Sequence, residues 1–326
     1  MNTISSTSNF IGILDNQYNL IEKLDFGSTC NVYKVMDNKT KEIKVAKIYS
    51  EEKTNDFQKE LDMINSISDL PLIIKFFASG EGPLHIKEKE TEETVIRKYI
   101  ILEYAKGSLF KFIKALNSGL SEDSGKYIFN QLILATKAIH EKGICHRDIK
   151  LENALLVGDE FSFRLCDFGL STSFLDKDNQ KIKLRDKVGS PFHYPPEILR
   201  GRDYDGEKID VFCAGVSLIC LLTGKIGFFE ASRFDDFYKL IITKKTEDYW
   251  NIVDKDNKLS KQVKELYIKM VAYNPKDRPT INEILNSEWL SDLRNANEEK
   301  LLYYKKKMID ELNNICSSGT ICADAP

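Results

Sequence analysis

The sequence has no run of apolar residues that approaches the roughly 20 needed to cross a lipid bilayer. Its N-terminus lacks the basic segment and apolar core of a secretory signal. Asn2 excludes N-myristoylation, which needs a glycine directly after the initiator methionine. The formal net charge is only −3, so the composition shows no bias toward nucleic acid or a membrane surface. We therefore expect a protein with neither of these partners.

The seven cysteines lack the C-x-x-C spacing that is typical of metal sites. Their number is odd, and Cys166, Cys213 and Cys220 stand in apolar stretches. This pattern predicts reduced, buried thiols in an intracellular protein, which we place in the cytoplasm while leaving the nucleus open. A hydrophobic content of 42% and a charged content of 30% are typical of a globular chain. With 326 residues, the chain is long enough for one large or two ordinary domains.

The stretch from His146 to Gly169 carries most of the recognisable chemistry. Residues 146–153 read H-R-D-I-K-L-E-N, and D-F-G follows at 167–169 after an apolar, strand-like segment. An acid, a lysine, an amide and a second acid on neighbouring turns can bind magnesium and orient a hydroxyl, which phosphoryl transfer requires. Two motifs in this order are highly specific. They resemble the signature of the eukaryotic-type serine/threonine protein kinases, with Ile149 in place of leucine.

This resemblance covers about residues 18 to 291 and implies an α+β, two-lobed protein-kinase-like fold. The small lobe, about residues 18–103, is expected to be antiparallel β structure with one main helix. The large lobe, about residues 108–291, is expected to be mainly α-helical. Residues 1–17 are rich in Ser, Thr and Asn and are predicted to be a flexible lead-in. Residues 292–326 hold an amphipathic helix that is expected to pack on the large lobe, with autoinhibition or a regulatory partner as the alternative.

The resemblance also implies a reaction, in which the γ-phosphoryl group of ATP passes to Ser or Thr hydroxyls of protein substrates. Asp148 would position the hydroxyl and accept its proton. Lys150 would neutralise charge near the γ-phosphate, and its presence favours Ser and Thr over Tyr as acceptors. Asn153 and Asp167 would hold Mg²⁺, so the implied cofactors are ATP and Mg²⁺.

The segment from Lys44 to Ile48 resembles the strand that carries the phosphate-binding lysine of the family. Lys47 is preferred over Lys44 because it shares a strand face with Val45, two residues earlier. A lysine on that half-buried face needs a partner. Glu60, in the next predicted helix, matches the glutamate that pairs with this lysine in active kinases.

The glycine-rich loop departs furthest from the family pattern G-x-G-x-x-G-x-V. Gly27 and Val32 match, whereas Asp25 and Cys30 replace the outer glycines that let backbone N–H groups approach phosphates. We expect a stiffer loop that binds nucleotide more weakly. This departure favours a rival interpretation, a pseudokinase scaffold that binds partners without turnover. The complete set of catalytic residues argues against that rival.

Further nucleotide contacts are implied by the resemblance alone. Leu102 would border the adenine pocket, and the backbone from Glu103 to Ala105 would hydrogen-bond the adenine edge. The full predicted set is Leu24, Gly27, Val32, Val45, Lys47, Leu102, Glu103, Ala105 and Leu155.

The predicted activation segment runs from Leu170 to Glu197 and ends in a form of the family pattern G-T-x-x-Y-x-A-P-E. Ser190 keeps the hydroxyl that would bond to Asp148 and Lys150. This segment forms the peptide-docking floor in protein kinases, which argues against a second rival, a kinase for small molecules. Arg278 is the expected ion-pair partner of Glu197, and the pair is expected to be structural.

Many kinases with an arginine before the catalytic aspartate need a phosphate on the activation segment to pair with it. The position four residues before Ser190, where that phosphate often lies, holds Asp186. A carboxylate there can make a charge-assisted contact to Arg147, although a phosphate carries about 1.5–2 charges and a carboxylate one. We therefore predict basal activity without phosphorylation. The alternative is that Asp186 is a solvated loop acid and that a hydroxyl among residues 171–173 is the switch.

Overall fold

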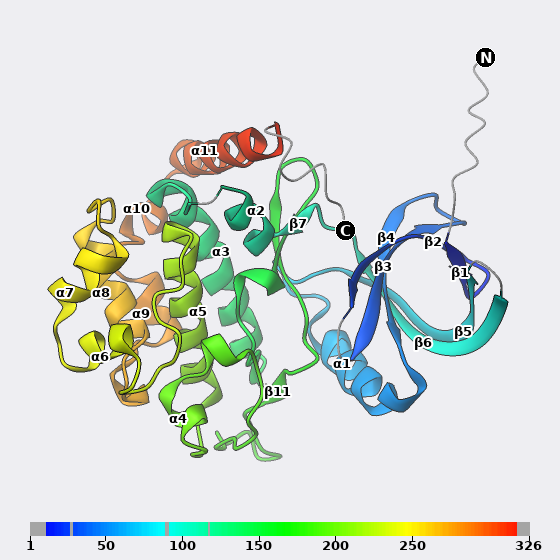
Figure 1. Ribbon diagram of the computed structural model, residues 1–326, viewed down its shortest axis with the longest axis horizontal. Helices are drawn as coiled ribbons and strands as arrows, with labels where there is room; N and C mark the ends of the chain where they lie inside the picture. The colour runs from blue at the N-terminus through cyan, green and yellow to red at the C-terminus, as the bar shows by residue number, and fades with distance from the viewer. Residues whose placement is uncertain (1–10, 27–28, 89–90, 117, 318–326) are drawn as a thin grey trace. The chain divides into compact units, whose positions relative to one another are not determined.

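The computed structural model describes residues 11–26, 29–88, 91–116 and 118–317 (Figure 1). The chain forms two compact units. Of the described residues, those up to Ser68 and those of Ile74–Tyr104 belong to the small unit, and those of Asp69–Ile73 and from Ala105 onward belong to the large unit. The small unit is rich in strands and the large unit is mainly helical, which confirms the α+β prediction. In the described ranges no helix is long and apolar enough to span a membrane.

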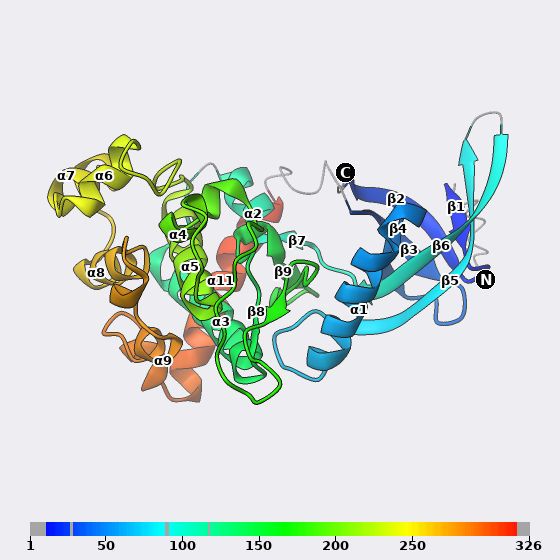
Figure 2. The ribbon, with the colours of Figure 1, turned by 90° about the horizontal axis from the view of Figure 1, so that it is seen from below.

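The strands of the small unit form a closed antiparallel barrel in the order β1-β2-β3-β4-β6-β5 (Figures 1 and 2). They are β1 (Gly12–Leu14), β2 (Tyr18–Phe26), β3 (Cys30–Asp37), β4 (Ile43–Tyr49), β5 (Phe76–Glu88) and β6 (Thr91–Glu103). The short strand β1 pairs with β2 on one side and with β5 on the other, so it forms the seam that closes the barrel.

The prediction of a flexible lead-in over residues 1–17 is wrong at its C-terminal end. Leu14 of β1 has no exposed surface and belongs to the barrel core. The Tyr99 hydroxyl donates to Asp15 Oδ2 at 2.5 Å and fixes the turn after β1. A strand of three residues is too short to show alternation in the sequence, which is why composition misled us. Residues 1–10 lie outside the described part of the chain.

Alternation along β4 sorts its side chains between two faces. Ala46 and Ile48 point into the barrel core, so Lys47 and Tyr49 point to the opposite face. Helix α1 (Thr54–Ile67) follows the 3-10 turn η1 (Glu51–Lys53) and packs against that side (Figure 2). Its buried residues are Phe57, Glu60, Ile64 and Ile67. The fold therefore brings Glu60 to the face of β4 that carries Lys47.

Ten helices are described in the large unit, together with short strands and 3-10 turns. The helices are α2 (Leu109–Leu116), α3 (Glu122–Glu141), α4 (Pro196–Leu199), α5 (Gly206–Thr223), α6 (Asp236–Ile242), α7 (Thr246–Val253), α8 (Lys261–Met270), α9 (Ile281–Leu285), α10 (Ser291–Arg294) and α11 (Glu298–Ser317). The strands are β7 (Gly107–Ser108), β8 (Ile144–Cys145), β9 (Ala154–Val157), β10 (Ser162–Leu165) and β11 (Thr172–Ser173). The turns are η2 (Leu151–Asn153), η3 (Pro191–His193) and η4 (Pro275–Asp277). Strands β10, β9 and β7 form one small sheet and β11 pairs with β8.

Helix α5 is the centre of the large unit and is buried on nearly all sides, because α3 and α8 pack against it. It begins at the cap Asp205, whose side chain accepts from Glu207 N, and ends at Gly224 in the left-handed region with φ 69°. Helix α3 begins at the cap Ser121, whose side chain accepts from Ser124 N. The chain after α3 turns at Gly143, with φ 75°, and leads into the segment that carries the catalytic motif.

Helix α11 packs against α3 and α2, which confirms the predicted packing of the C-terminal helix (Figure 1). Its buried residues are Tyr304, Met308, Leu312 and Ile315. Glu311 accepts hydrogen bonds from Ser121 N at 2.9 Å and from Ser121 Oγ at 2.8 Å. Lys307 pairs with Asp123 at 2.5 Å. The C-terminal helix therefore binds the first turn of α3 through both apolar and polar contacts.

Replacing Glu311 with alanine should destabilise the large unit, because it removes two acceptors from the N-terminus of α3. A loss of about 1–2 kcal/mol is expected, the usual effect of losing a cap or one hydrogen bond to a charged group. Thermal unfolding followed by circular dichroism would measure it. Glu299→Ala, at an exposed position of the same helix, is the control. Equal melting temperatures for the two variants would show that the Glu311 contact does not stabilise the fold.

Candidate active site

In the small unit, Lys47 and Glu60 form a buried ion pair. The Lys47 Nζ lies 2.5 Å from Glu60 Oε1, and the two side chains are 11% and 3% exposed. The Tyr49 hydroxyl donates to the second oxygen, Glu60 Oε2, also at 2.5 Å. Lys44, the other lysine considered on this strand, instead pairs with Asp37 at 2.8 Å. The structure thus brings together the lysine and the glutamate that the sequence singled out.

The predicted nucleotide contacts fall into both units. The register of the barrel pairs Val32 with Lys47 and Val45 with Leu102, so these four side chains share one face of the sheet. The Glu103 N–H donates to Lys75 O at 3.0 Å, so a contact from Glu103 to adenine would have to come from its carbonyl group.

The positions of the other predicted nucleotide-binding residues say less about how ATP would bind. Leu24 is partly buried and stands at an irregularity in the pairing of β2 with β3. Ala105 and Leu155 belong to the large unit, where Leu155 pairs with Ser108. Gly27 lies outside the described residues. Their roles in binding ATP remain predictions.

In the large unit, Asp148 is the centre of a dense hydrogen-bond network and is only 4% exposed. Its Oδ1 accepts from Ser190 N at 2.9 Å. Its Oδ2 accepts from Asn153 Nδ2 at 3.1 Å and lies 2.8 Å from Lys150 Nζ. Lys150 Nζ also donates to Ser190 Oγ at 2.8 Å, as the sequence predicted. Burial opposes the charge of Lys150, but Asp148 outweighs it and raises the pKa of the lysine, which therefore stays charged.

The backbone that carries Asp148 is held by Asp210 from helix α5. Asp210 has no exposed surface, and its two oxygens accept from His146 N and Arg147 N, each at 2.8 Å. His140 Nε2 also contacts Asp210 Oδ2 at 2.8 Å. These bonds hold Arg147 in the left-handed region, at φ 67°, which is costly for a side chain with a Cβ atom. The catalytic segment, residues 146–153, is therefore held in place by hydrogen bonds to the buried helix α5.

Arg147 joins the catalytic segment to the activation segment. Its Nε donates to Leu170 O at 2.7 Å, and its Nη1 donates to the Tyr204 hydroxyl at 3.2 Å. The same Nη1 lies 3.4 Å from Asp186 Oδ2, and the Asp186 side chain is 75% exposed. The structure thus contains the predicted contact between Arg147 and Asp186. The contact is single and long rather than bidentate.

Asn153 and Asp167 are brought close by the backbone bond from Cys166 N to Asn153 O, at 2.9 Å. The Asn153 amide nitrogen faces Asp148, which directs its amide oxygen elsewhere. One amide oxygen and one carboxylate suit Mg²⁺, which commonly uses one or two protein ligands and substrate phosphates. In the described residues no group of three His, Cys, Asp or Glu side chains could hold a metal ion. The roles of Asn153 and Asp167 as Mg²⁺ ligands stay predictions.

Glu197 and Arg278 form the predicted ion pair in the interior of the large unit. The Arg278 side chain is 0% exposed, and its Nη1 and Nη2 donate to the two Glu197 oxygens at 2.6 and 2.7 Å. Arg278 also donates to the carbonyl groups of Ala272 and Lys208. Its guanidinium lies 4.8 Å from the centre of the Phe212 ring. This pair fixes the end of the activation segment to the chain before α9.

His193 occupies the place of the tyrosine in the family pattern. Its Nδ1 is buried and has no hydrogen-bond partner among the described residues. Burial lowers the pKa of His193 to about 4, so its imidazole is neutral near pH 7. The substitution therefore adds no positive charge beside Asp148.

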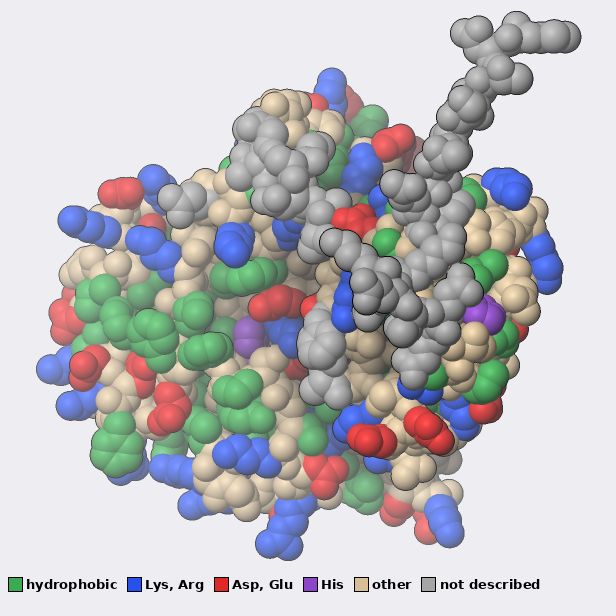
Figure 3. Space-filling view, turned by 45° about the vertical axis from the view of Figure 1, so that its right-hand side comes forward, with side chains coloured by type: hydrophobic (Ala, Val, Ile, Leu, Met, Phe, Trp, Pro, Cys, Tyr) green, Lys and Arg blue, Asp and Glu red, His purple; other side chains and the backbone are tan. Residues whose placement is uncertain are grey.

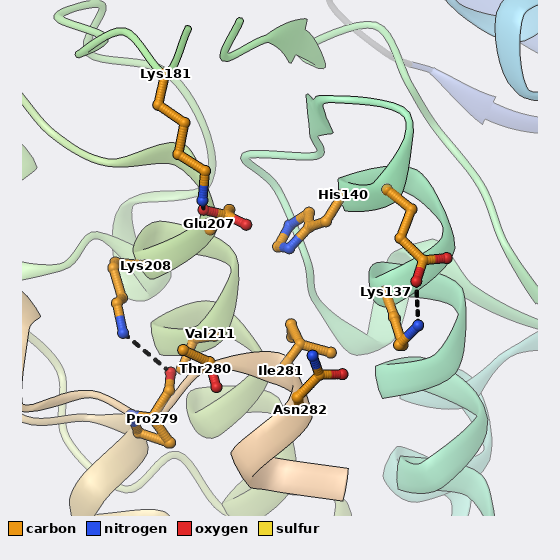
Figure 4. Close-up of a pocket in the computed structure, with 11 residues that line it drawn as sticks. Lys137, His140, Lys181, Glu207, Lys208, Val211, Pro279, Thr280, Ile281 and Asn282 are labelled. Atoms are coloured by element: carbon orange, nitrogen blue, oxygen red, sulfur yellow. Dashed lines mark hydrogen bonds and ion pairs between the residues drawn. The ribbon is translucent and has the colours of Figure 1, made fainter. Parts of the chain in front are cut away.

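A pocket of about 280 Å³ lies where the end of α3, the start of α5 and the chain entering α9 meet (Figure 4). The His140 imidazole points into it, with Val211 and Ile281 on the other walls. None of the predicted catalytic or nucleotide residues lines this pocket. It lies behind the catalytic segment, to which His140 connects it through Asp210.

Sequence reasoning missed Tyr49, His140 and Tyr204 as parts of the site. The sequence does contain an indication for Tyr49, because it stands two residues after Lys47 and therefore shares the strand face of Lys47. His140 and Tyr204 had none, because each reaches its partner across more than 50 residues of sequence, as in the His140–Asp210 contact with a separation of 70. The role of Asp210 appears only with the fold, which brings it to His146 N and Arg147 N.

A β-rich unit with a buried lysine–glutamate pair and a helical unit with this aspartate network define a protein of the protein-kinase fold. The chain matches the protein kinase domain family over residues 18–290 and belongs to that family. It is similar to the serine/threonine-protein kinase SAPK7 of Oryza sativa subsp. japonica, at 36% identity over 236 residues, covering 69% of this chain and 62% of that protein. It is similar to the serine/threonine-protein kinase SRK2C of Arabidopsis thaliana, at 31% identity over 276 residues, covering 84% and 75%.

Proposed function

We propose that the protein is an ATP- and Mg²⁺-dependent serine/threonine protein kinase that phosphorylates protein substrates. The network in which Asp148 is bonded to Lys150, Asn153 and Ser190 carries this proposal. The names of the similar plant proteins support it. The match covers only 62% of SAPK7, so the name of that protein does not by itself give the activity of this chain. The proposal therefore also rests on the residues of this chain.

The side chains of this network and the Lys47–Glu60 pair have separate tasks in the proposed reaction. Asp148 accepts the proton of the substrate hydroxyl and orients its oxygen toward the phosphorus atom. Lys150, bonded to both Asp148 and Ser190, neutralises charge near the transferred group. Lys47, held by Glu60, contacts the α- and β-phosphates. Mg²⁺, when bound by Asn153 and Asp167, supplies neutralisation of phosphate charge.

A protein substrate is favoured over a small molecule by the segment from Ser190 to Glu197. Phe192 in η3 is 53% exposed, although it directly follows the network around Asp148. Figure 3 shows hydrophobic side chains gathered on one face of the large unit. An exposed apolar residue beside the reacting group suits a polypeptide that lies across it.

The rival role of a scaffold without turnover rests on Asp25 and Cys30. Cys30 is 9% exposed and begins strand β3, where it pairs with Tyr49. Cys30 is thus packed as part of the strand. Asp25 is exposed at the end of β2. The complete set of catalytic residues remains the argument against the scaffold role.

A peptide library with degenerate positions around Ser, Thr or Tyr, incubated with ATP and Mg²⁺, tests the proposal. We expect phosphate on Ser and Thr and little on Tyr. Nucleotide binding without transfer would favour the scaffold. Transfer to small hydroxyl compounds but not to peptides would favour the second rival.

Basal activity without phosphorylation is also proposed, because Asp186 already contacts Arg147. Enzyme treated with phosphatase should keep most of its activity, whereas Asp186→Ala should lose activity several-fold, since Arg147 loses an acid that helps to order the activation segment. Asp178→Ala, at an exposed acid of the same segment, is the matched control. Steady-state rates on one peptide measure all three.

The opposite pattern would place the switch elsewhere in the segment. If phosphatase abolishes activity and Asp186→Ala retains it, a hydroxyl among residues 171–173 is the control point. In the structure Ser171 Oγ donates to His146 O at 3.3 Å and Ser173 Oγ donates to Leu175 O at 3.0 Å. These two hydroxyls already donate hydrogen bonds within the large unit.

A regulatory partner at α11 would have to bind its exposed side, where Leu302 is 63% and Tyr303 is 56% exposed, because the other side packs on α3. On the same helix Leu301 is 38% exposed, whereas Tyr304 is buried. The cytoplasmic location stays a prediction.

A further inference from the structure

The carboxylate of Glu60 is 97% removed from solvent, and each of its oxygens has its own donor. Oε1 takes the Lys47 ammonium and Oε2 takes the Tyr49 hydroxyl, both at 2.5 Å. A buried carboxylate needs donors on both oxygens, because an acceptor left unpaired in the interior is costly. The buried group is therefore a triad of Lys47, Glu60 and Tyr49 rather than a pair.

Tyr49 is held firmly in place to make this bond. It is 1% exposed at the end of β4, and its ring lies edge-on to Phe57 of α1, with centres 5.3 Å apart at 74°. Burial raises the pKa of the Tyr49 hydroxyl, so it stays protonated and acts as the donor. Phe57 and Glu60 are three residues apart and lie on the same side of α1. Tyr49 therefore contacts the helix through both its ring and its hydroxyl.

We propose that Tyr49 is a positioning residue for phosphoryl transfer, which holds helix α1 in the arrangement where Glu60 fixes Lys47. The inference rests on the proposed kinase function. If α1 rotated or moved away, water could replace both donors of Glu60 at little cost. In the paired arrangement water is excluded, so the Tyr49 hydroxyl stabilises that arrangement selectively. Tyr49 thus favours the active arrangement of the small unit without an activating partner.

Tyr49→Phe tests this proposal because it keeps the ring against Phe57 and removes only the hydroxyl. We expect kcat/KM for ATP to fall about tenfold, the order of effect of one hydrogen bond to a charged group. KM for the peptide should stay unchanged, since the triad touches no peptide-binding residue. Hydrogen exchange of the full chain should be faster in α1 than in the wild type.

Tyr99→Phe is the matched control. Tyr99 is also buried, at 5% exposure, and its hydroxyl also donates to a carboxylate at 2.5 Å, that of Asp15 at the barrel seam. We expect this variant to lower the melting temperature at least as much as Tyr49→Phe does, while leaving kcat/KM for ATP within twofold. Equal losses of kcat/KM in the two variants would reduce Tyr49 to a stabilising residue and overturn the proposal.

A second comparison uses Glu60→Gln, which weakens the ion pair to Lys47. Adding Tyr49→Phe to Glu60→Gln should change kcat/KM less than twofold, because the hydroxyl acts through the ion pair. A full tenfold further loss would overturn the proposal. Failure of the proposed function is distinguishable, because the wild type would then phosphorylate no peptide. The exchange rates of α1 in Tyr49→Phe and Tyr99→Phe would still decide the role of Tyr49.

Discussion

Replacing Asp148 with asparagine is expected to lower kcat on Ser and Thr peptides by several orders of magnitude while leaving ATP binding largely intact. General-base catalysis typically contributes about 10²–10⁴-fold, and asparagine cannot accept the hydroxyl proton. The side chain keeps its size and can still accept from Ser190 N, so the network should keep its shape. Lys150 loses its anionic partner, which adds to the loss. Initial rates and calorimetric titration with an ATP analogue would separate the two effects.

The control for Asp148→Asn is Asp159→Asn, the same chemical change at a side chain that is 99% exposed. Its partner is Lys106, at 2.8 Å, in a contact outside the Asp148 network. We expect wild-type rates from this variant. Turnover by Asp148→Asn close to that of the wild type would show that Asp148 is not the proton acceptor. It would also contradict the mechanism proposed above.

Removing Arg278 should have the largest effect on stability, about 3–5 kcal/mol, because Arg278→Met leaves the Glu197 carboxylate buried without its partner. Glu197 itself is 6% exposed. The carbonyl groups of Ala272 and Lys208 also lose their donors. We expect a sharply lower melting temperature and rapid proteolysis of the large unit.

The double variant Glu197→Gln/Arg278→Met separates two causes of the lost stability. One is the loss of the attraction between the two side chains, and the other is the burial of the Glu197 carboxylate without a partner. If the unpaired carboxylate is the main cost, the double variant should recover a substantial part of the stability that Arg278→Met loses. Arg294→Met, at an exposed arginine, should leave the melting temperature nearly unchanged. An Arg278→Met chain as stable as the wild type would show that the pair contributes little.

The parts of the site that lie on one motif or one strand face could be predicted from the sequence. Asp148, Lys150 and Asn153 lie within six residues of chain, so their spacing nearly determines their proximity. Lys47 and Glu60 were identified by their resemblance to the lysine–glutamate pair of the family, and alternation along the strand favoured Lys47 over Lys44. Asp186 was placed beside Arg147 by counting back from Ser190, and the structure has that contact.

The parts that depend on distant contacts could not be predicted. The support of Asp148 by Asp210 joins two segments 63 and 64 residues apart, and only the folded large unit shows it. The barrel seam was missed because β1 has only three residues. An apolar stripe also does not show which of its residues is buried, since Leu301 is 38% exposed while Tyr304 is buried.

The closure of the barrel by β1 bears on how this domain would behave when shortened. The family match begins at Tyr18, and a recombinant chain that starts there would lack Gly12–Leu14. Unpaired N–H and C=O groups of β2 and of the outer half of β5 would then face solvent. Exposed strand edges of this kind recruit edges of neighbouring molecules, so the shortened protein would tend to precipitate or form adventitious dimers. Gly12 suits the seam because a Cβ atom there would lie 2.3 Å from His85 O, closer than the strands allow. Family boundaries alone would therefore give the wrong starting residue for a soluble domain.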